Sequence, residues 1–283
     1  PEVESLRRFL HARCVGRVYA RLELASFTAL KTVEVPLTGL AGLTIGDVVR
    51  RGKFIALESD GLWLAFHLAR AGWLRWKDQV PTTPARPGKG PLTLRVALDD
   101  GSGFELTEAG TQRKLAIHVV RDLAEVGQIA TLGPDPLDEA FTLEVFTQIL
   151  ADAGRSQLKG VLRDQRTIAG IGNAYSDEIL HAAKLSPFKP ANGLDAAQIA
   201  QLYGVLRTEL REAIERSAGL AAKDLKGEKK SGLRVHGRTG EACGVCGDTI
   251  AQVSFADSSL QYCPTCQTGG KPLADRRMSR LLK

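Results

Sequence analysis

The sequence predicts an α+β protein of several domains, with an N-terminal β-sandwich flanked by a helix, a helical domain and a C-terminal cysteine-rich β-hairpin. Three observations carry this prediction. Short apolar runs alternate with turns rich in Gly and Asp up to about residue 120, apolar residues then recur at helical spacing, and four of the five cysteines gather near the end of the chain. Strands followed by helices are typical of α+β proteins.

The chain has 283 residues, enough for two or three compact units, and its 43% hydrophobic and 25% charged residues are typical of a soluble globular protein. No apolar run reaches the ~18 residues that a membrane span needs. The first residues show no basic segment followed by an apolar one, so the pattern predicts no signal peptide. We therefore expect a cytoplasmic protein that does not associate with membranes.

The N-terminal part of the chain is predicted to form one helix and then a series of strands. Val3, Leu6 and Leu10 recur on one face of a helix over residues 2–13. The strands that follow are separated by turns such as Asp60-Gly61, and their spacing favours a sandwich or a barrel. The predicted strands cover residues 17–24, 47–49, 54–58, 62–69, 92–98, 103–106 and 115–120.

From residue 138 onward the pattern predicts helices, because apolar residues such as Phe141, Val145 and Ile149 are spaced by about one helical turn. Residues 227–240 are polar and basic, which favours a linker. The expected domains are the β-sandwich at 1–125, the helical domain at 126–226, the linker with the cysteine module at 227–270, and a basic tail at 271–283.

The charge of the chain indicates a polyanionic partner. The formal net charge is +6 and the sequence pI is about 9.1. Residues 223–238 hold six Lys or Arg against two acids, and residues 271–283 hold five against one. A solvated basic tail is the alternative interpretation of the second segment.

The cysteine module is the strongest local signal for a metal. Cys243, Cys246, Cys263 and Cys266 form two Cys-x-x-Cys pairs, and the 16 residues between the pairs are enough for a β-hairpin. Two such turns supply four thiolates for one tetrahedral zinc ion. Because no histidine lies nearby in the sequence and no ligand position is left open, we expect one structural Zn²⁺.

A second motif is a Gly-x-Gly turn at Gly170 and Gly172 that runs into a predicted helix. Backbone N–H groups at a helix start bind phosphate well, and Asn173 can cap the helix or bind a phosphate oxygen. Lys159 could reach the same phosphate, and an ordinary surface lysine is the alternative. Alone, this motif is weak, since many helices begin with Gly-Asn.

The first two residues can support covalent chemistry. The secondary amine of a terminal Pro1 can attack the C1′ carbon of a deoxyribose, expel the base and form an iminium, which then permits β-elimination. Glu2 could act as acid and base on the sugar oxygen. The alternative is that Pro1 has no function, because many chains begin with Pro after removal of Met.

Together these motifs resemble the formamidopyrimidine-DNA glycosylase/endonuclease VIII (Fpg/Nei) family of DNA-repair enzymes, and the resemblance is spread over nearly the whole chain. The family fold is a β-sandwich, a helix-two-turn-helix domain and a zinc finger. The motifs that carry the resemblance are Pro1-Glu2-Val3-Glu4, Arg50-Arg51-Gly52-Lys53-Phe54, His67-Leu68 followed by Gly72, residues 132–137, Lys159, residues 170–178 and the four cysteines.

The resemblance implies a role for each matching residue. Pro1 resembles the Schiff-base nucleophile, Glu2 the general acid/base, and Lys53 the lysine that assists β-elimination. Contacts to DNA phosphates are implied for three further residues, and these are His67, Lys159 and Asn173. The implied enzyme is a monomeric bifunctional DNA glycosylase and AP lyase on damaged double-stranded DNA, associated with a bacterial-type nucleoid and holding one Zn²⁺.

The chain departs from the family pattern at its start. The family begins Pro-Glu-Leu-Pro-Glu-Val-Glu, and Pro1-Glu2-Val3-Glu4 matches the second Pro-Glu better than the first. Two interpretations stay open. Either three residues precede this sequence and carry the nucleophile, or the start is shorter and Pro1 acts in place.

The residues that fill the gap left by a flipped base also differ from the family pattern. The turn after His67-Leu68 reads Ala69-Arg70-Ala71, and the loop at 108–114 contains Gln112 and Arg113, so we expect Arg70, Gln112 and Arg113 on the DNA side. Ser258 stands near the position of an expected arginine. These departures favour a Nei-like enzyme for oxidised pyrimidines. The alternatives are an Fpg-like purine preference, an AP lyase with weak glycosylase activity, and a non-catalytic protein that binds damaged DNA.

Overall fold

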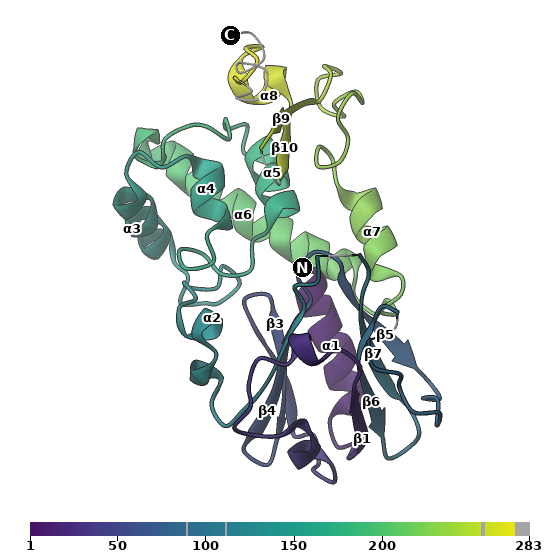
Figure 1. Cartoon of the computed structure of the whole chain (residues 1–283). Coiled ribbons are helices and arrows are strands. Elements are labelled where there is room, and N and C mark those ends of the chain that lie inside the picture. Colours follow the sequence, from purple (N-terminus) through teal and green to yellow (C-terminus); the bar gives the residue numbers. More distant parts are fainter. Residues whose placement is uncertain (89, 111, 256–257, 275–283) are drawn as a thin grey trace. The chain divides into compact units, whose positions relative to one another are not determined.

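The computed structural model describes residues 1–283 except 89, 111, 256–257 and 275–283, so most of the predicted basic tail lies outside the described residues. The chain divides into two compact units (Figure 1). Unit 1 comprises residues 1–131 and 217–228, and unit 2 comprises residues 132–216 and 229–283.

Unit 1 is a β-sandwich of two four-stranded antiparallel sheets, as the sequence predicted. One sheet has the order β2-β3-β4-β8 and the other has the order β1-β6-β7-β5. The strands are β1 (Tyr19–Leu24), β2 (Asp47–Arg51), β3 (Phe54–Ser59), β4 (Leu62–His67), β5 (Gly72–Lys77), β6 (Leu92–Leu98), β7 (Gly103–Glu108) and β8 (Ala116–Val120). Shorter elements of unit 1 are η1 (Phe27–Ala29), η2 (Leu37–Leu40), η3 (Leu123–Glu125) and α2 (Gly127–Ala130).

The core of unit 1 lies between the two sheets. Phe66 of β4 and Phe104 of β7 are fully buried, and their ring centroids lie 6.2 Å apart, which joins the sheets face to face. Helix α1 (Glu2–Cys14) adds Leu6 and Leu10 to the same cluster, and Figure 1 shows a sheet on either side of this helix. The predicted helix and sandwich therefore share one hydrophobic core.

The sequence pattern does not predict one strand of the sandwich, β5. β5 lies at the edge of its sheet, and its exposed Arg75 interrupts the apolar pattern on which the prediction depended. By contrast, the predicted Asp60-Gly61 turn connects β3 and β4, as Ser59 pairs with Leu62. Asp60 and Gly61 have positive φ, 51° and 74°, as a tight two-residue hairpin requires.

Unit 2 contains the predicted helices and the cysteine hairpin. The longest helix, α6, spans 21 residues and buries Leu202, Leu206 and Leu210 against the other helices. The elements of unit 2 are α3 (Leu143–Ala153), α4 (Leu158–Arg163), α5 (Asn173–Ala182), η4 (Ala191–Gly193), α6 (Ala196–Arg216), β9 (Ala251–Ser254), β10 (Ser259–Tyr262) and α8 (Pro264–Thr268).

The segment that follows α6 differs from the expected linker. Residues 217–228 return to unit 1, where Ala222 and Leu225 are buried in its core, and helix α7 (Leu225–Gly232) then continues into unit 2. The polar composition of 227–240 suggested no regular structure, but only one face of α7 needs apolar residues for packing. Among the helices within the described residues, none combines the length and apolar character of a membrane-spanning helix.

Candidate functional site

Lys53 lies in the two-residue turn between β2 and β3. Arg51 and Phe54 are the last paired residues of the two strands, so only Gly52 and Lys53 make the connection. Gly52 has φ +55°, which glycine adopts at little cost. The Arg-Arg-Gly-Lys-Phe motif is therefore a hairpin that presents the partly buried Lys53 at its tip.

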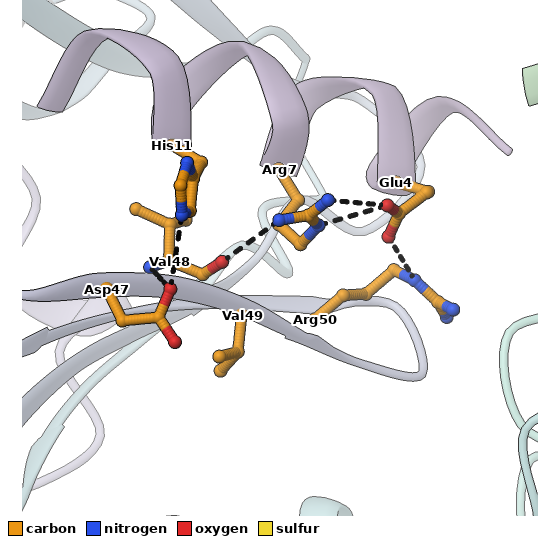
Figure 2. Close-up of a pocket in the computed structure, with 7 residues that line it drawn as sticks. All are labelled: Glu4, Arg7, His11, Asp47, Val48, Val49 and Arg50. Atoms are coloured by element: carbon orange, nitrogen blue, oxygen red, sulfur yellow. Dashed lines mark hydrogen bonds and ion pairs between the residues drawn. The ribbon is translucent and has the colours of Figure 1, made fainter. Parts of the chain in front are cut away.

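This turn is tied to the first turn of helix α1 through Arg50 (Figure 2). Arg50 donates Nη1–H to the carbonyl of Gly52 at 3.0 Å and Nε–H to Glu4 Oε2 at 3.0 Å. Arg7 donates from Nε and Nη2 to the other Glu4 oxygen, at 3.0 and 2.9 Å. The turn that carries Lys53 is thus fixed to the helix that begins directly after Pro1.

The Glu4 carboxylate stays ionised in this network. Burial alone would raise its pKa, but hydrogen bonds and charges from Arg7 and Arg50 outweigh burial and bring the pKa below the ordinary value of 4.5. Pro1 occupies the N-cap position of α1, and its carbonyl accepts a hydrogen bond from the Ser5 N–H at 2.9 Å. Pro1, Glu2 and the Glu4 carboxylate that binds Arg50 therefore all lie in the first turn of α1.

His67 ends β4, pairs across the sheet with Phe54, and packs on that ring at 4.9 Å. Burial, followed by the charges of Lys53 and His118, lowers the pKa of His67 to about 4. His67 is thus neutral at physiological pH, and its Nδ1 accepts a hydrogen bond from the Ala69 N–H at 3.2 Å. The proton must then reside on Nε2, which makes His67 a neutral hydrogen-bond donor.

The turn after His67 presents Arg70 to solvent. Gly72 closes this turn with a hydrogen bond to the Leu68 carbonyl at 2.9 Å, and a Cβ on Gly72 would lie 2.1 Å from that oxygen. Ala69 has φ +53°, an unfavourable conformation for a residue other than glycine. Gly72 is therefore required for packing, and the tip of the turn, including Arg70, is exposed.

The loop that contains Arg113 is also closed by hydrogen bonds at its base. The buried Glu108 carboxylate accepts from the N–H groups of Lys114 and Leu115, at 2.8 to 3.1 Å. Arg113 is exposed and donates to the carbonyl of Gly90 at 2.8 Å, and Gln112 beside it is exposed as well. Both side chains thus lie on the surface of unit 1.

Lys159 differs from the expected phosphate contact, because its residue is only 4% exposed. Its Nζ donates to Asp177 Oδ1 at 2.5 Å, to Ser176 Oγ at 2.9 Å and to the Asn173 carbonyl at 3.2 Å. Burial lowers the pKa of Lys159, and the charge of Asp177 opposes that effect. In this conformation its three donors hold α4 against α5, so Lys159 is a structural residue here.

Asn173 is the first residue of α5, directly after the Gly-x-Gly turn. Its Nδ2 donates to the Ser259 carbonyl of β10 at 2.7 Å, so part of the side chain binds the hairpin. Its Oδ1 is buried and has no hydrogen-bond partner among the described residues. Gly170 has φ +89°, which explains the first glycine of the turn.

Two neighbouring acids of α5, Asp177 and Glu178, are almost fully buried. The sequence did not predict their structural role. Glu178 accepts from the N–H groups of Arg234, Val235 and His236 at 2.8 to 3.0 Å. Asp177 accepts from His236 Nδ1 at 2.7 Å and from the Gln261 N–H at 3.2 Å. Adjacent acids inside an otherwise buried helix are the signal that indicates such a structural role.

The four cysteines form a site that fits zinc. Their sulfur atoms lie within 4.8 Å of one another, with separations of 3.9 Å for Cys243 and Cys266 and 3.4 Å for Cys246 and Cys263. A tetrahedron with Zn–S bonds of about 2.3 Å has sulfur atoms about 3.8 Å apart. The predicted four-cysteine zinc site is therefore confirmed in its geometry.

The pKa values of two thiols of this site are shifted in opposite directions by their surroundings. Burial acts to raise the pKa of Cys243, but hydrogen bonds from the backbone of Val245 and Cys246 and from His181 outweigh it and lower the pKa to about 6. Burial and the neighbouring cysteines raise the pKa of Cys263 to about 11. A bound cation stabilises all four thiolates together.

Comparison with known proteins agrees with this architecture along the chain. The model of the formamidopyrimidine-DNA glycosylase N-terminal domain matches residues 1–116, that of the H2TH domain of the same proteins matches residues 132–224, and that of a zinc finger found in FPG and IleRS matches residues 240–269. The chain belongs to the formamidopyrimidine-DNA glycosylase family. Its three modules follow the family order.

Individual members of the family are similar over nearly their full length. The chain is 34% identical to the formamidopyrimidine-DNA glycosylase of Herpetosiphon aurantiacus, covering 94% of this chain and 98% of that protein. It is 35% identical to the enzyme of that name from Thermus thermophilus, with 95% and 98% covered. An uncharacterized formamidopyrimidine-DNA glycosylase-like protein of Mycobacterium tuberculosis is 58% identical over 161 residues, which is 57% of this chain and all of that protein.

Solved structures of the family have the same fold. The Lactococcus lactis Fpg in complex with FAPY-dG-containing DNA aligns with a TM-score of 0.82 at 28% identity, covering 95% of this chain and 99% of that one. The same enzyme bound to DNA with an AP site aligns with a TM-score of 0.81, covering 95% and 98%. The family assignment and the zinc finger are thus confirmed together.

Proposed function

We propose that this protein is a bifunctional DNA glycosylase and AP lyase, which excises oxidised bases from double-stranded DNA and then cuts the strand by β-elimination. The observation that carries the proposal is the presence of all three family modules in one chain, with 34% identity over nearly the full length of named glycosylases. We expect this function to place the protein on the DNA of a bacterial-type nucleoid.

The proposed chemistry begins at the start of α1. The Pro1 nitrogen forms a bond to C1′ while the glycosidic bond breaks, and the base leaves with that electron pair and takes up a proton. Glu2 exchanges a proton with the sugar oxygen as the ring opens to the iminium. Removal of a C2′ proton then expels the 3′ phosphate, and we assign Lys53 to assist this elimination. The alternative register, in which a residue before Pro1 carries the nucleophilic amine, uses the same Lys53.

The tether through Arg50 supports this assignment of Lys53. It joins the Lys53 turn to the helix start that carries Pro1 and Glu2, so both parts of the proposed chemistry rest on one ionic network. His67 is proposed to donate from Nε2 to a phosphate, and the exposed Arg70 and Arg113 to approach the DNA. Asn173 and the zinc finger are proposed to contribute phosphate binding from unit 2.

The substrate class is proposed from two lines of argument. Relatives named formamidopyrimidine-DNA glycosylase, and a MutM structure in complex with carbocyclic 8-oxo-G DNA, favour purine-derived lesions. The exposed Arg70 and the loop with Gln112 and Arg113, where the family pattern is changed, favour oxidised pyrimidines. We give precedence to purine lesions, because the relatives resemble this chain over almost its whole length.

A cleavage panel tests the substrate proposal. Duplexes with 8-oxoguanine, formamidopyrimidine, thymine glycol or an AP site are each incubated with the full chain. We expect cleavage at the purine lesions at least ten times faster than at thymine glycol, and cleavage at the AP site. The reverse order would establish the pyrimidine alternative.

Borohydride trapping on AP-site DNA tests the covalent chemistry. We expect a trapped protein–DNA adduct that forms much more slowly in Pro1→Gly, because this variant replaces the secondary amine by a primary amine. An adduct that forms at the wild-type rate in Pro1→Gly would show that the secondary amine of Pro1 is not required. A protein that binds the DNA and gives no adduct would instead be the non-catalytic homologue.

A further inference from the structure

His181 of α5 contacts the cysteine cluster from outside the cysteine module. It lies 62 residues before Cys243 in the sequence, and its Nε2 is 3.4 Å from Cys243 Sγ. The residue is 4% exposed, so water does not separate the ring from the sulfur at this distance. The four cysteines thus have a buried nitrogen next to one of their sulfur atoms.

The chemistry of the two groups decides which one donates. A zinc-bound cysteine is a thiolate and can only accept, so the ring nitrogen that faces it must carry the proton. His181 is then the Nε2–H tautomer and its Nδ1 is a bare acceptor. That Nδ1 is buried and has no hydrogen-bond partner among the residues that the structure describes.

A bare buried nitrogen is unfavourable, and a phenyl ring of similar volume would avoid it. The hydrogen bond to sulfur is the compensating interaction of this ring.

We propose that His181 is a positioning residue of the zinc centre, which donates Nε2–H to the Cys243 thiolate and holds this sulfur in place as a zinc ligand. The hydrogen bond stabilises the anionic sulfur and fixes its direction. It also attaches the metal centre to α5, the helix that begins at Asn173 and already binds the hairpin through the Ser259 carbonyl.

Other contacts place the same helix against the finger along its length. Asp177 accepts the Gln261 N–H of β10, and Gln267 of α8 donates to the Leu185 carbonyl just after α5 at 2.9 Å. His181 is the member of this set that reaches a proposed metal ligand. Loss of its N–H should therefore change the metal centre while the remaining contacts keep the finger in place.

Zinc release from the full chain tests the proposal. We compare the wild type with His181→Phe in the presence of excess chelator and a chromogenic zinc indicator. Removal of such an outer hydrogen bond costs about 10- to 100-fold in metal affinity, so we expect release at least about ten times faster. A matched control is His11→Phe, which changes an exposed histidine of α1 in unit 1. Release from His181→Phe within twofold of the wild type would overturn the proposal.

A measurement on the wild-type protein avoids dependence on the folding of the variant. The ¹⁵N shifts of the histidine rings in the zinc-loaded chain report the tautomer, and the His181 signals are assigned by their absence in His181→Gln. We expect protonated Nε2 and bare Nδ1. The Nδ1–H tautomer would place two acceptors face to face and would refute the hydrogen bond. Neither measurement uses DNA, so its result does not depend on the proposed glycosylase activity.

Discussion

Unit 1 and unit 2 use their charged side chains in different ways. In unit 1, Lys53, Arg70 and Arg113 lie on turns and loops, and the hydrogen bonds that hold those turns come mostly from neighbouring residues such as Arg50 and Glu108. In unit 2, Lys159 and Glu178 are themselves buried and hold elements together. Charged residues of the family motifs are thus accessible on turns in one unit and buried between elements in the other.

The largest effect is expected from a change to the zinc site of unit 2. Cys263→Ser removes one of four sulfur ligands, and because structural zinc contributes directly to folding, we expect loss of zinc and of hairpin structure, with DNA affinity reduced at least about 100-fold. Metal analysis and a DNA-binding titration check this result. Cys14→Ala, which removes a buried thiol of unit 1, should retain zinc. A metal-free, folded protein that still binds DNA fully would show that the finger is dispensable.

A second test concerns the buried pair of Lys159 and Asp177. Lys159→Met leaves the carboxylate buried without its cation, which costs about 3 kcal/mol in the free energy of unfolding. Denaturant unfolding measures this cost, and the exposed Lys184→Met is the control. If Lys159 instead binds phosphate, the variant would keep its stability and lose DNA affinity, and the contrast between the units would fail.

A third test loosens the tether of unit 1. Glu4→Gln weakens the ionic contact to Arg50, so the Lys53 turn should be less well held and kcat/KM for AP-site cleavage should fall by about tenfold. Cleavage kinetics measure the effect, with the exposed Glu34→Gln as control. An unchanged kcat/KM would separate the tether from the chemistry.

The same variant has a pH dependence with a defined sign. The pKa of Glu4 is depressed in the folded protein, so its stabilising contribution is present above the ordinary value of 4.5 and is lost as pH falls through the folded-state pKa. The stability difference between wild type and Glu4→Gln should therefore be largest near neutral pH and shrink in acid. Thermal unfolding between pH 3 and 7 measures it, and a difference that grows in acid would contradict the network.

The smallest effects are expected for His67 and Arg70, which should differ in how they change the salt dependence of DNA binding. His67 is neutral, since its pKa lies at about 4, so His67→Gln should weaken DNA binding only a few-fold and leave the salt dependence unchanged. Arg70→Ala should reduce the slope of log affinity against log salt by about 1, as loss of one phosphate contact requires. Titrations at several salt concentrations distinguish them, and equal slopes for the two variants would refute the assignment.

Much of this architecture could be predicted from the sequence because local patterns determine it. The apolar alternation of the strands, the Asp60-Gly61 hairpin and the paired cysteines each report on neighbours in the chain. The roles of Lys159, Asp177 and His181 depend on partners that distant segments bring together. A lysine in the first turn of a helix gives no local sign that it will be buried and paired with an acid 18 residues later. Edge strand β5 was missed for a related reason, since its exposed face accepts basic residues.

The return of residues 217–228 to unit 1 has a consequence for synthesis of the protein. Trp73 Nε1 donates to the Ala222 carbonyl, and Leu225 lies 1% exposed in the sandwich core, so the first 131 residues lack part of their own interior. During translation this part emerges only after helices α3 to α6 have left the ribosome. The strands of the sandwich are therefore synthesised first, but its core is completed only after the following helices have been made. A nascent chain arrested before residue 217 would therefore expose apolar surface, which identifies the stage at which assistance by chaperones would matter most.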